Sequence, residues 1–126
     1  MNVRPDDLRA LGRRLTALHA ALLEFERSAY EATHGPTKPA ELLRLLLQDP
    51  SFAWLRPLSA IIAQIDETLD PREATADVDV KGLFDAAQRL LRSADRGVFQ
   101  TKYRDALQRS PDVVMAHADV VKLLRA

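Results

Sequence analysis

The stretch from Glu41 to Ile65 constrains the fold most, because it is strongly apolar and prolines interrupt it at defined places. Proline is well tolerated in the first turn of a helix, whereas the residue before a proline is disfavoured in helical geometry. Each proline therefore ends one helix and can begin the next. We expect a helix that begins at Pro39, a single helical turn that begins at Pro50, and a kink or restart at Pro57.

The leucines between positions 42 and 47 are interrupted only by Arg44. A short helix that is apolar around most of its circumference is normally buried on several sides, so we expect other helices to cover this one. Phe52 and Trp54 follow in the next turn. We expect Trp54 to be a core anchor near the margin of the core, because its indole N–H needs a hydrogen-bond partner.

The first predicted helix is long and carries a heptad seam without a break. It begins near Pro5 and ends at Gly35, since glycine suits the left-handed conformation that terminates a helix. Gly12 lies within it and would allow a neighbouring helix to approach closely. The seam residues, alternately three and four apart, are Leu8, Leu11, Leu15, Leu18, Leu22, Phe25 and Ala29. Such a seam is typical of an antiparallel bundle helix or of a dimer contact, and we favour a symmetric homodimer in which part of the seam faces its copy.

The C-terminal half contains three further helical stripes, separated near Gly97 and Pro111. Residues 72–81 lack helical periodicity, and the alternation at Val78 and Val80 indicates a loop or a helix start. The stripes are Leu83, Phe84, Ala87, Leu90, Leu91 and Ala94; Val98, Phe99, Tyr103, Ala106 and Leu107; and Val113, His117, Val120, Val121 and Leu124. The sequence thus predicts an all-α fold: a helical bundle of about five to six helices in a single domain, residues 1–126, with a long first helix and kinked central helices.

Composition excludes several classes of protein. The chain has 126 residues, enough for one core, and its 18 basic residues balance its 18 acidic ones. It has no cysteine, which excludes disulfides, thiolate metal sites and cysteine nucleophiles. The N-terminus has no apolar signal core, and the apolar runs are far shorter than the roughly 20 residues of a membrane span, so a cytoplasmic protein is expected. The preference for arginine over lysine, with abundant alanine and leucine, is typical of a GC-rich bacterial genome.

The three histidines do not form a recognisable metal motif. Bundles that bind two metal ions usually repeat Glu-x-x-His, and here that pattern occurs once, at Glu31 and His34. His19 and His117 lie on other segments, and the sequence leaves open whether the three converge. No metal site and no cofactor are predicted. His117 lies on an apolar stripe, so we expect a core or interface histidine with a hydrogen-bond partner.

Charged residues are unevenly distributed along the chain. The acidic residues between Asp66 and Asp79 lack the spacing of a calcium-binding loop, so we interpret them as a solvated face. The C-terminal half has a basic stripe, and the contrast in charge indicates either a docking face or a contact within the chain. The stripe consists of Arg89, Arg92, Arg96, Lys102 and Arg104, and it is diluted by Asp95 and Asp105. This pattern makes nucleic acid an unlikely partner.

The segment Leu-Leu-Gln-Asp-Pro-Ser-Phe-Ala-Trp-Leu-Arg-Pro-Leu-Ser, residues 46–59, resembles a family of small uncharacterised bacterial all-helical proteins. Residues 99–103 and 110–114 fit the same resemblance. The resemblance implies a helical fold and assigns no functional residue.

No catalytic residues are predicted, because serine, threonine and tyrosine lack a recognisable base and there is no glycine-rich phosphate loop. Our leading hypothesis is a non-enzymatic protein-interaction module that self-associates, with a homodimer or another protein as the partner. The alternative is a small-ligand-binding or enzymatic helical bundle whose pocket lies near Trp54, Arg56 and His117.

Overall fold

The computed structural model describes residues 4–70, 72, 80–92 and 96–125. In that part of the chain it contains seven helices and no strand, so the predicted all-α class is confirmed. The helices are α1 (Pro5–His34), α2 (Pro39–Gln48), α3 (Pro50–Ala53), α4 (Arg56–Leu69), α5 (Val80–Arg92), α6 (Val98–Arg109) and α7 (Pro111–Arg125). The count exceeds the predicted five to six because the single turn at Pro50 is a separate short helix.

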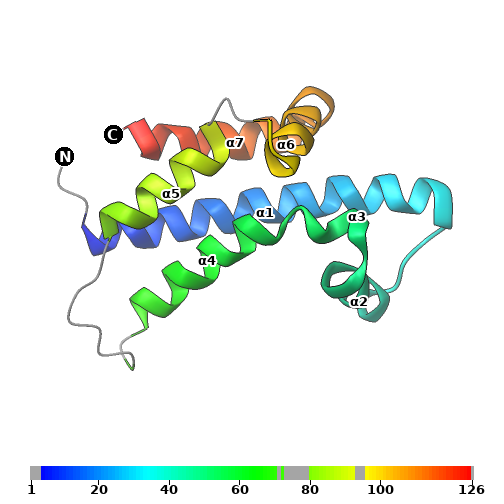
Figure 1. Cartoon of the computed structure of the whole chain (residues 1–126), viewed down its shortest axis with the longest axis horizontal. Coiled ribbons are helices and arrows are strands. Elements are labelled where there is room, and N and C mark those ends of the chain that lie inside the picture. The colour runs from blue at the N-terminus through cyan, green and yellow to red at the C-terminus, as the bar shows by residue number, and fades with distance from the viewer. Residues whose placement is uncertain (1–3, 71, 73–79, 93–95, 126) are drawn as a thin grey trace.

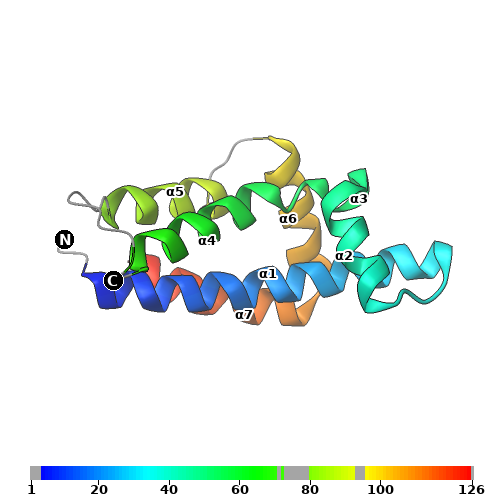
Figure 2. The same ribbon diagram turned by 90° about the horizontal axis from the view of Figure 1, so that it is seen from below.

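The long helix α1 forms the axis of the molecule, and α4 and α7 run antiparallel along it (Figures 1 and 2). The start of α1 and the end of α7 lie at the same end of the molecule. A hydrogen bond from the Arg14 guanidinium to the backbone carbonyl of Asp119, 2.7 Å long, links α1 to α7. Helix α5 packs on α4 and α1, and α6 connects α5 to α7.

The ends of α1 follow from local chemistry. The Asp7 carboxylate accepts a hydrogen bond of 3.0 Å from the backbone N–H of Arg4, which satisfies a donor that no helical carbonyl could reach. At the other end Gly35 terminates the helix as predicted, with a positive φ of 83° that glycine adopts readily, but its ψ of 176° lies outside the left-handed helical region that was expected. The backbone N–H and the hydroxyl of Thr37 then both donate to the Glu31 carboxylate, each at 2.7 Å. These two bonds hold the turn that leads into α2.

The central helices are broken where the prolines predict. The Asp49 carboxylate accepts a hydrogen bond of 2.8 Å from the backbone N–H of Ser51 and caps the turn that begins at Pro50. Trp54 and Leu55 form the link between α3 and α4, both with right-handed helical dihedrals. Because the link keeps this conformation, α4 restarts immediately after it.

The heptad seam of α1 is the centre of the core of a single chain. Leu8, Leu11, Leu15, Leu18 and Leu22 are fully buried against the chain's own helices. The seam from Leu8 to Leu22 is therefore covered within one chain, and the homodimer itself stays a prediction. Helices α4, α5 and α7 cover α1 between them. A set of shorter helices buries the same apolar stripe as one long helix.

Gly12 permits a close approach of a neighbouring helix, as predicted. A β-carbon at this position would lie 3.0 Å from Cγ2 of Ile65 on α4, closer than ordinary van der Waals contact. On α4, the buried residues beside α1 are Leu58 and Ile65. The missing side chain therefore sets the distance between α1 and α4.

Several sequence-based expectations concern residues outside the described part. Val78 and Ala94 are among them, while Val80 is the first residue of α5. Within the described residues no helix combines the length and the apolarity that crossing a membrane requires.

Candidate functional site

A short hydrogen bond joins α6 to α7. The hydroxyl of Tyr103 lies 2.6 Å from Nδ1 of His117, which is half-buried, whereas Tyr103 is almost completely buried. The ring of Tyr103 also stacks on Phe99 at 5.4 Å, and Phe99 contacts Trp54 at 5.5 Å between ring centroids. A continuous set of aromatic contacts thus runs from the α3–α4 link to α7 and fixes the position of the imidazole.

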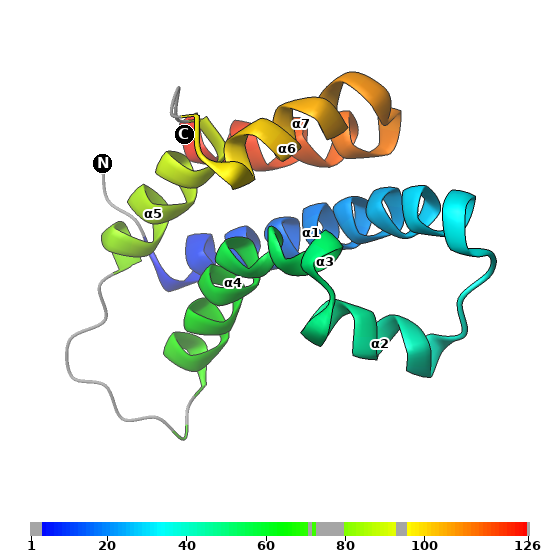
Figure 3. The same cartoon turned by 45° about the vertical axis from the view of Figure 1, so that its right-hand side comes forward.

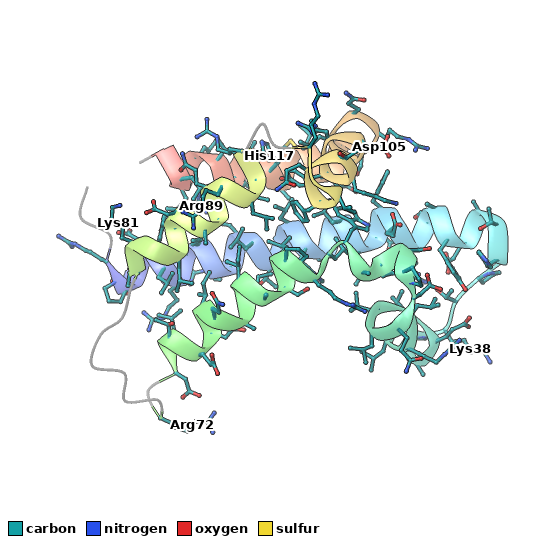
Figure 4. The ribbon with its side chains drawn as sticks, viewed as in Figure 1. Lys38, Arg72, Lys81, Arg89, Asp105 and His117 are labelled. Carbon is teal, nitrogen blue, oxygen red and sulfur yellow. The ribbon has the colours of Figure 1, made fainter. Side chains whose placement is uncertain are left out.

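Next to this hydrogen bond is a cavity of about 280 Å³ between α5, α6 and α7. Figure 4 shows His117 in the region where these helices meet. The lining residues are Leu91 and Arg92 of α5, Gln100, Tyr103, Arg104 and Leu107 of α6, and His117 of α7. Among the lining residues that the structure describes, two are arginines and none is acidic, although acidic and basic residues are equally frequent in the chain as a whole.

The pKa values of His117 and Tyr103 are both shifted so that the neutral form is favoured. Burial lowers the pKa of His117, and the positive charge of Arg92 lowers it further. Burial also raises the pKa of Tyr103 well above its usual range. At neutral pH the pair is therefore a neutral imidazole and a neutral phenol. Tyr103 is thus unsuited to act as a nucleophile or base at that pH.

No known family model, curated protein or solved structure matches this chain. The resemblance noted for residues 46–59 thus remains an expectation.

The three residues predicted to bind a ligand do not come together in this cavity. His117 lines it, but Trp54 and Arg56 do not. The Arg56 guanidinium is exposed and donates a 2.9 Å hydrogen bond to the backbone carbonyl of Leu47, at the end of α2. That hydrogen bond satisfies a backbone carbonyl that has no partner within the last turn of the helix. Arg56 therefore has a local structural role.

Trp54 is a core residue, as expected, but its indole N–H has no acceptor in hydrogen-bonding geometry among the described residues. The Glu26 carboxylate on α1 is the group that interacts with it. Burial raises the pKa of Glu26, while Lys102 and the Trp54 indole lower it in part. The contact between Glu26 and the Trp54 indole is thus weaker than a full hydrogen bond.

The sequence missed Arg92, Gln100, Tyr103 and Arg104 as site residues. A signal was present for the arginines, since both belong to the basic stripe. Helical spacing alone could not show that these two cations line the same cavity as His117, because Arg92 and Arg104 come from different helices.

The three histidines have separate partners and do not converge. His19 pairs with the hydroxyl of Ser59 at 2.9 Å between α1 and α4. His34 stacks on Tyr30 at 4.0 Å at the end of α1. Across residues 4–70, 80–92 and 96–125, no group of three or more histidine, aspartate or glutamate side chains is arranged to hold a metal ion.

Helix α2 departs from the expectation that it would be covered on several sides. Leu45 is buried, but Leu43 and Leu47 are 58% and 63% exposed. In Figure 3, α2 projects away from the bundle formed by the other helices. Ala40 is also exposed, so three apolar residues of α2 with spacings of three and four face solvent. The expectation was wrong because α3 is too short to bury more than one side of α2.

Proposed function

We propose that this protein is a non-enzymatic interaction module that self-associates, and that the contact is made by α2. The observation that supports this proposal is the exposure of Leu43 and Leu47 one turn apart on one helix. Contiguous exposed apolar residues are uncommon on monomers and are typical of protein-interaction surfaces. We assign the self-association expected from the sequence to α2 rather than to α1, because Leu8, Leu11, Leu15, Leu18 and Leu22 of the α1 seam are buried within one chain.

A second copy of α2 fits this surface. In a contact with two-fold symmetry, each residue meets its counterpart in a reciprocal manner. If two copies of α2 lie antiparallel, the Leu43 side chains meet at the axis, and each Leu47 meets Ala40 of the other copy. The large residue is thus placed opposite the small one in both halves of the contact. A helix of ten residues is only about 15 Å long, so we expect a weak dimer that depends on concentration.

Sedimentation velocity over a range of protein concentrations tests this proposal. We expect the wild-type protein to show a rising sedimentation coefficient, and the variant Leu43→Glu/Leu47→Glu to remain a folded monomer. Met115→Glu is the matched control, because Met115 is 70% exposed but lies on α7. It should leave association unchanged. A wild-type protein that stays monomeric at high concentration would exclude self-association.

A further inference from the structure

We infer that a cavity between α1 and α4 binds a free amino acid with an apolar side chain. This cavity has a volume of about 290 Å³ and lies where the two helices run side by side (Figure 2). The inference goes beyond self-association through α2, because no residue of α2 lines the cavity. It rests on three features of the lining: an apolar floor, a cation on one helix and a carboxylate on the other.

The floor forms where α1 comes close to α4. Gly12 has no side chain, and a β-carbon there would lie 3.0 Å from Cγ2 of Ile65. Both residues line the cavity, together with the half-buried Leu69, which lies one turn further along α4. The floor therefore offers an apolar surface on which an aliphatic side chain is removed from water.

Two charged residues flank this floor from opposite helices. Arg13 follows Gly12 on α1, and Asp66 follows Ile65 on α4, and both line the cavity. Both residues are exposed, and neither makes an ion pair or a side-chain hydrogen bond with another residue of the described part of the chain. The guanidinium and the carboxylate are thus available to a ligand that carries both charges.

A zwitterion carries an ammonium and a carboxylate on one carbon atom and matches this pair. A guanidinium presents paired N–H donors to the two oxygens of a carboxylate, so Arg13 binds the carboxylate of the ligand. The Asp66 carboxylate accepts hydrogen bonds from the ammonium. The Thr16 hydroxyl lines the same cavity and donates to the backbone carbonyl of Gly12 at 2.7 Å. Its oxygen is therefore a second acceptor for the ammonium.

The size and the charges of the cavity limit the ligand. Its volume of about 290 Å³ is at the lower limit of ligand sites, about 300–1,000 Å³, and fits a single amino acid better than a peptide. Arg9 also lines the cavity, but its guanidinium already pairs with Asp6 at 3.0 Å. The side chain of the ligand thus meets the apolar floor, which favours an aliphatic amino acid such as leucine.

Titration by two-dimensional ¹H–¹⁵N NMR tests the inference with L-leucine and two of its analogues. Isocaproate lacks the ammonium of leucine, and isoamylamine lacks the carboxylate. We expect L-leucine to cause saturable shifts of the backbone amides of Thr16 and Leu69. Either analogue should bind about fivefold more weakly, the effect of losing one ion pair between exposed groups. Equal binding of L-leucine and an analogue, or no saturable shift with L-leucine, would overturn the inference.

Three variants separate a built site from diffuse surface charge. Arg13→Gln and Asp66→Asn should each weaken the binding of L-leucine about fivefold. Arg13→Gln should leave the binding of isoamylamine unchanged, because that analogue has no carboxylate. Glu67→Gln is the matched control, since Glu67 is an exposed acid next to Asp66 that does not line the cavity, and it should have no effect. Equal weakening by Asp66→Asn and Glu67→Gln would contradict the inference.

Discussion

The Tyr103 hydroxyl and the His117 imidazole, 2.6 Å apart, form a polar contact between two helices whose other buried residues are mainly apolar. A buried hydroxyl that loses its hydrogen-bond partner still carries the free-energy cost of having been removed from water. The pair therefore couples the packing of α6 on α7 to the state of one titratable ring. It also forms one wall of the cavity between α5, α6 and α7.

Replacing His117 by leucine should destabilise the protein. The sequence alone predicts a neutral or stabilising change, because the neighbours on the α7 stripe are apolar. The structure reverses that prediction, since the substitution removes the partner of a nearly buried hydroxyl. We expect the free energy of unfolding, measured by urea denaturation, to fall by about 1–3 kcal/mol.

The control for this change is the double variant Tyr103→Phe/His117→Leu. It removes both polar groups, so it should be more stable than the sum of the two single variants predicts. Additive losses would show that the hydrogen bond contributes nothing to stability.

The stability should decrease as the pH falls below neutrality. Burial lowers the pKa of His19, and burial together with Arg92 lowers that of His117, so both rings bind protons more weakly in the folded state. The unfolded chain takes up protons near the ordinary histidine pKa of about 6.5, and this favours unfolding. The contribution of the two rings is thus fully present above that pH and is lost as the pH falls towards their folded pKa values.

Urea unfolding at about pH 7.5 and about pH 5.5 measures this effect. In His19→Gln/His117→Gln the decrease over this range should be smaller. His34→Gln serves as the control, because His34 is exposed at the end of α1. NMR titration that places the folded pKa of His117 above 6.5 would contradict the prediction.

Glutamate at both Leu15 and Leu22 should unfold the protein rather than separate two subunits. Both leucines are fully buried within one chain, and truncating one such leucine to alanine already costs about 2–5 kcal/mol. The free-energy cost of burying two charges exceeds the free energy of unfolding of a small domain, about 5–15 kcal/mol. Circular dichroism should show the loss of helix. A folded monomer would mean that the seam is an interface between copies after all.

Alanine at position 12 should destabilise the protein despite its higher helix propensity. Alanine is favoured over glycine within a helix by about 1 kcal/mol. The added β-carbon, however, would lie 3.0 Å from Cγ2 of Ile65, and overpacking typically costs about 1–3 kcal/mol. We expect a net loss of about 1 kcal/mol in thermal or urea unfolding. Leucine at position 65 lacks Cγ2, so Gly12→Ala should cost less stability in the Ile65→Leu variant than in the wild-type protein. An equal cost in both would place the strain elsewhere.

Helix boundaries could be predicted because local residues determine them. Proline begins four of the helices, at Pro5, Pro39, Pro50 and Pro111, because its ring fixes φ at a helical value. Gly35 ends a helix because glycine can adopt a positive φ. The same holds for the capping of α3 by Asp49. The identity of Trp54 as a core residue was also predictable, because a large apolar ring is stabilised by burial in almost any helical arrangement.

The candidate site could not be predicted in the same way. Tyr103 and His117 are on different helices, and their hydrogen bond depends on how α6 is placed against α7. Arg92 and Arg104 were visible as members of a basic stripe, but a one-dimensional stripe does not show which cations share a cavity. Arg56 was chosen for its proximity to Trp54 in sequence, yet its guanidinium binds the carbonyl of Leu47.

The sequence by itself determined the all-helical class, the long first helix and the breaks in the central helices, because these depend on periodicity and on the dihedral limits of proline and glycine. Only the tertiary structure decided which apolar faces are covered. The seam of α1 became core, whereas Leu43 and Leu47 of α2 stayed exposed, although both sets are leucines at helical spacing. The physical reason is that apolar burial is not directional: a leucine stripe requires a surface to cover it, but does not specify which helix supplies that surface.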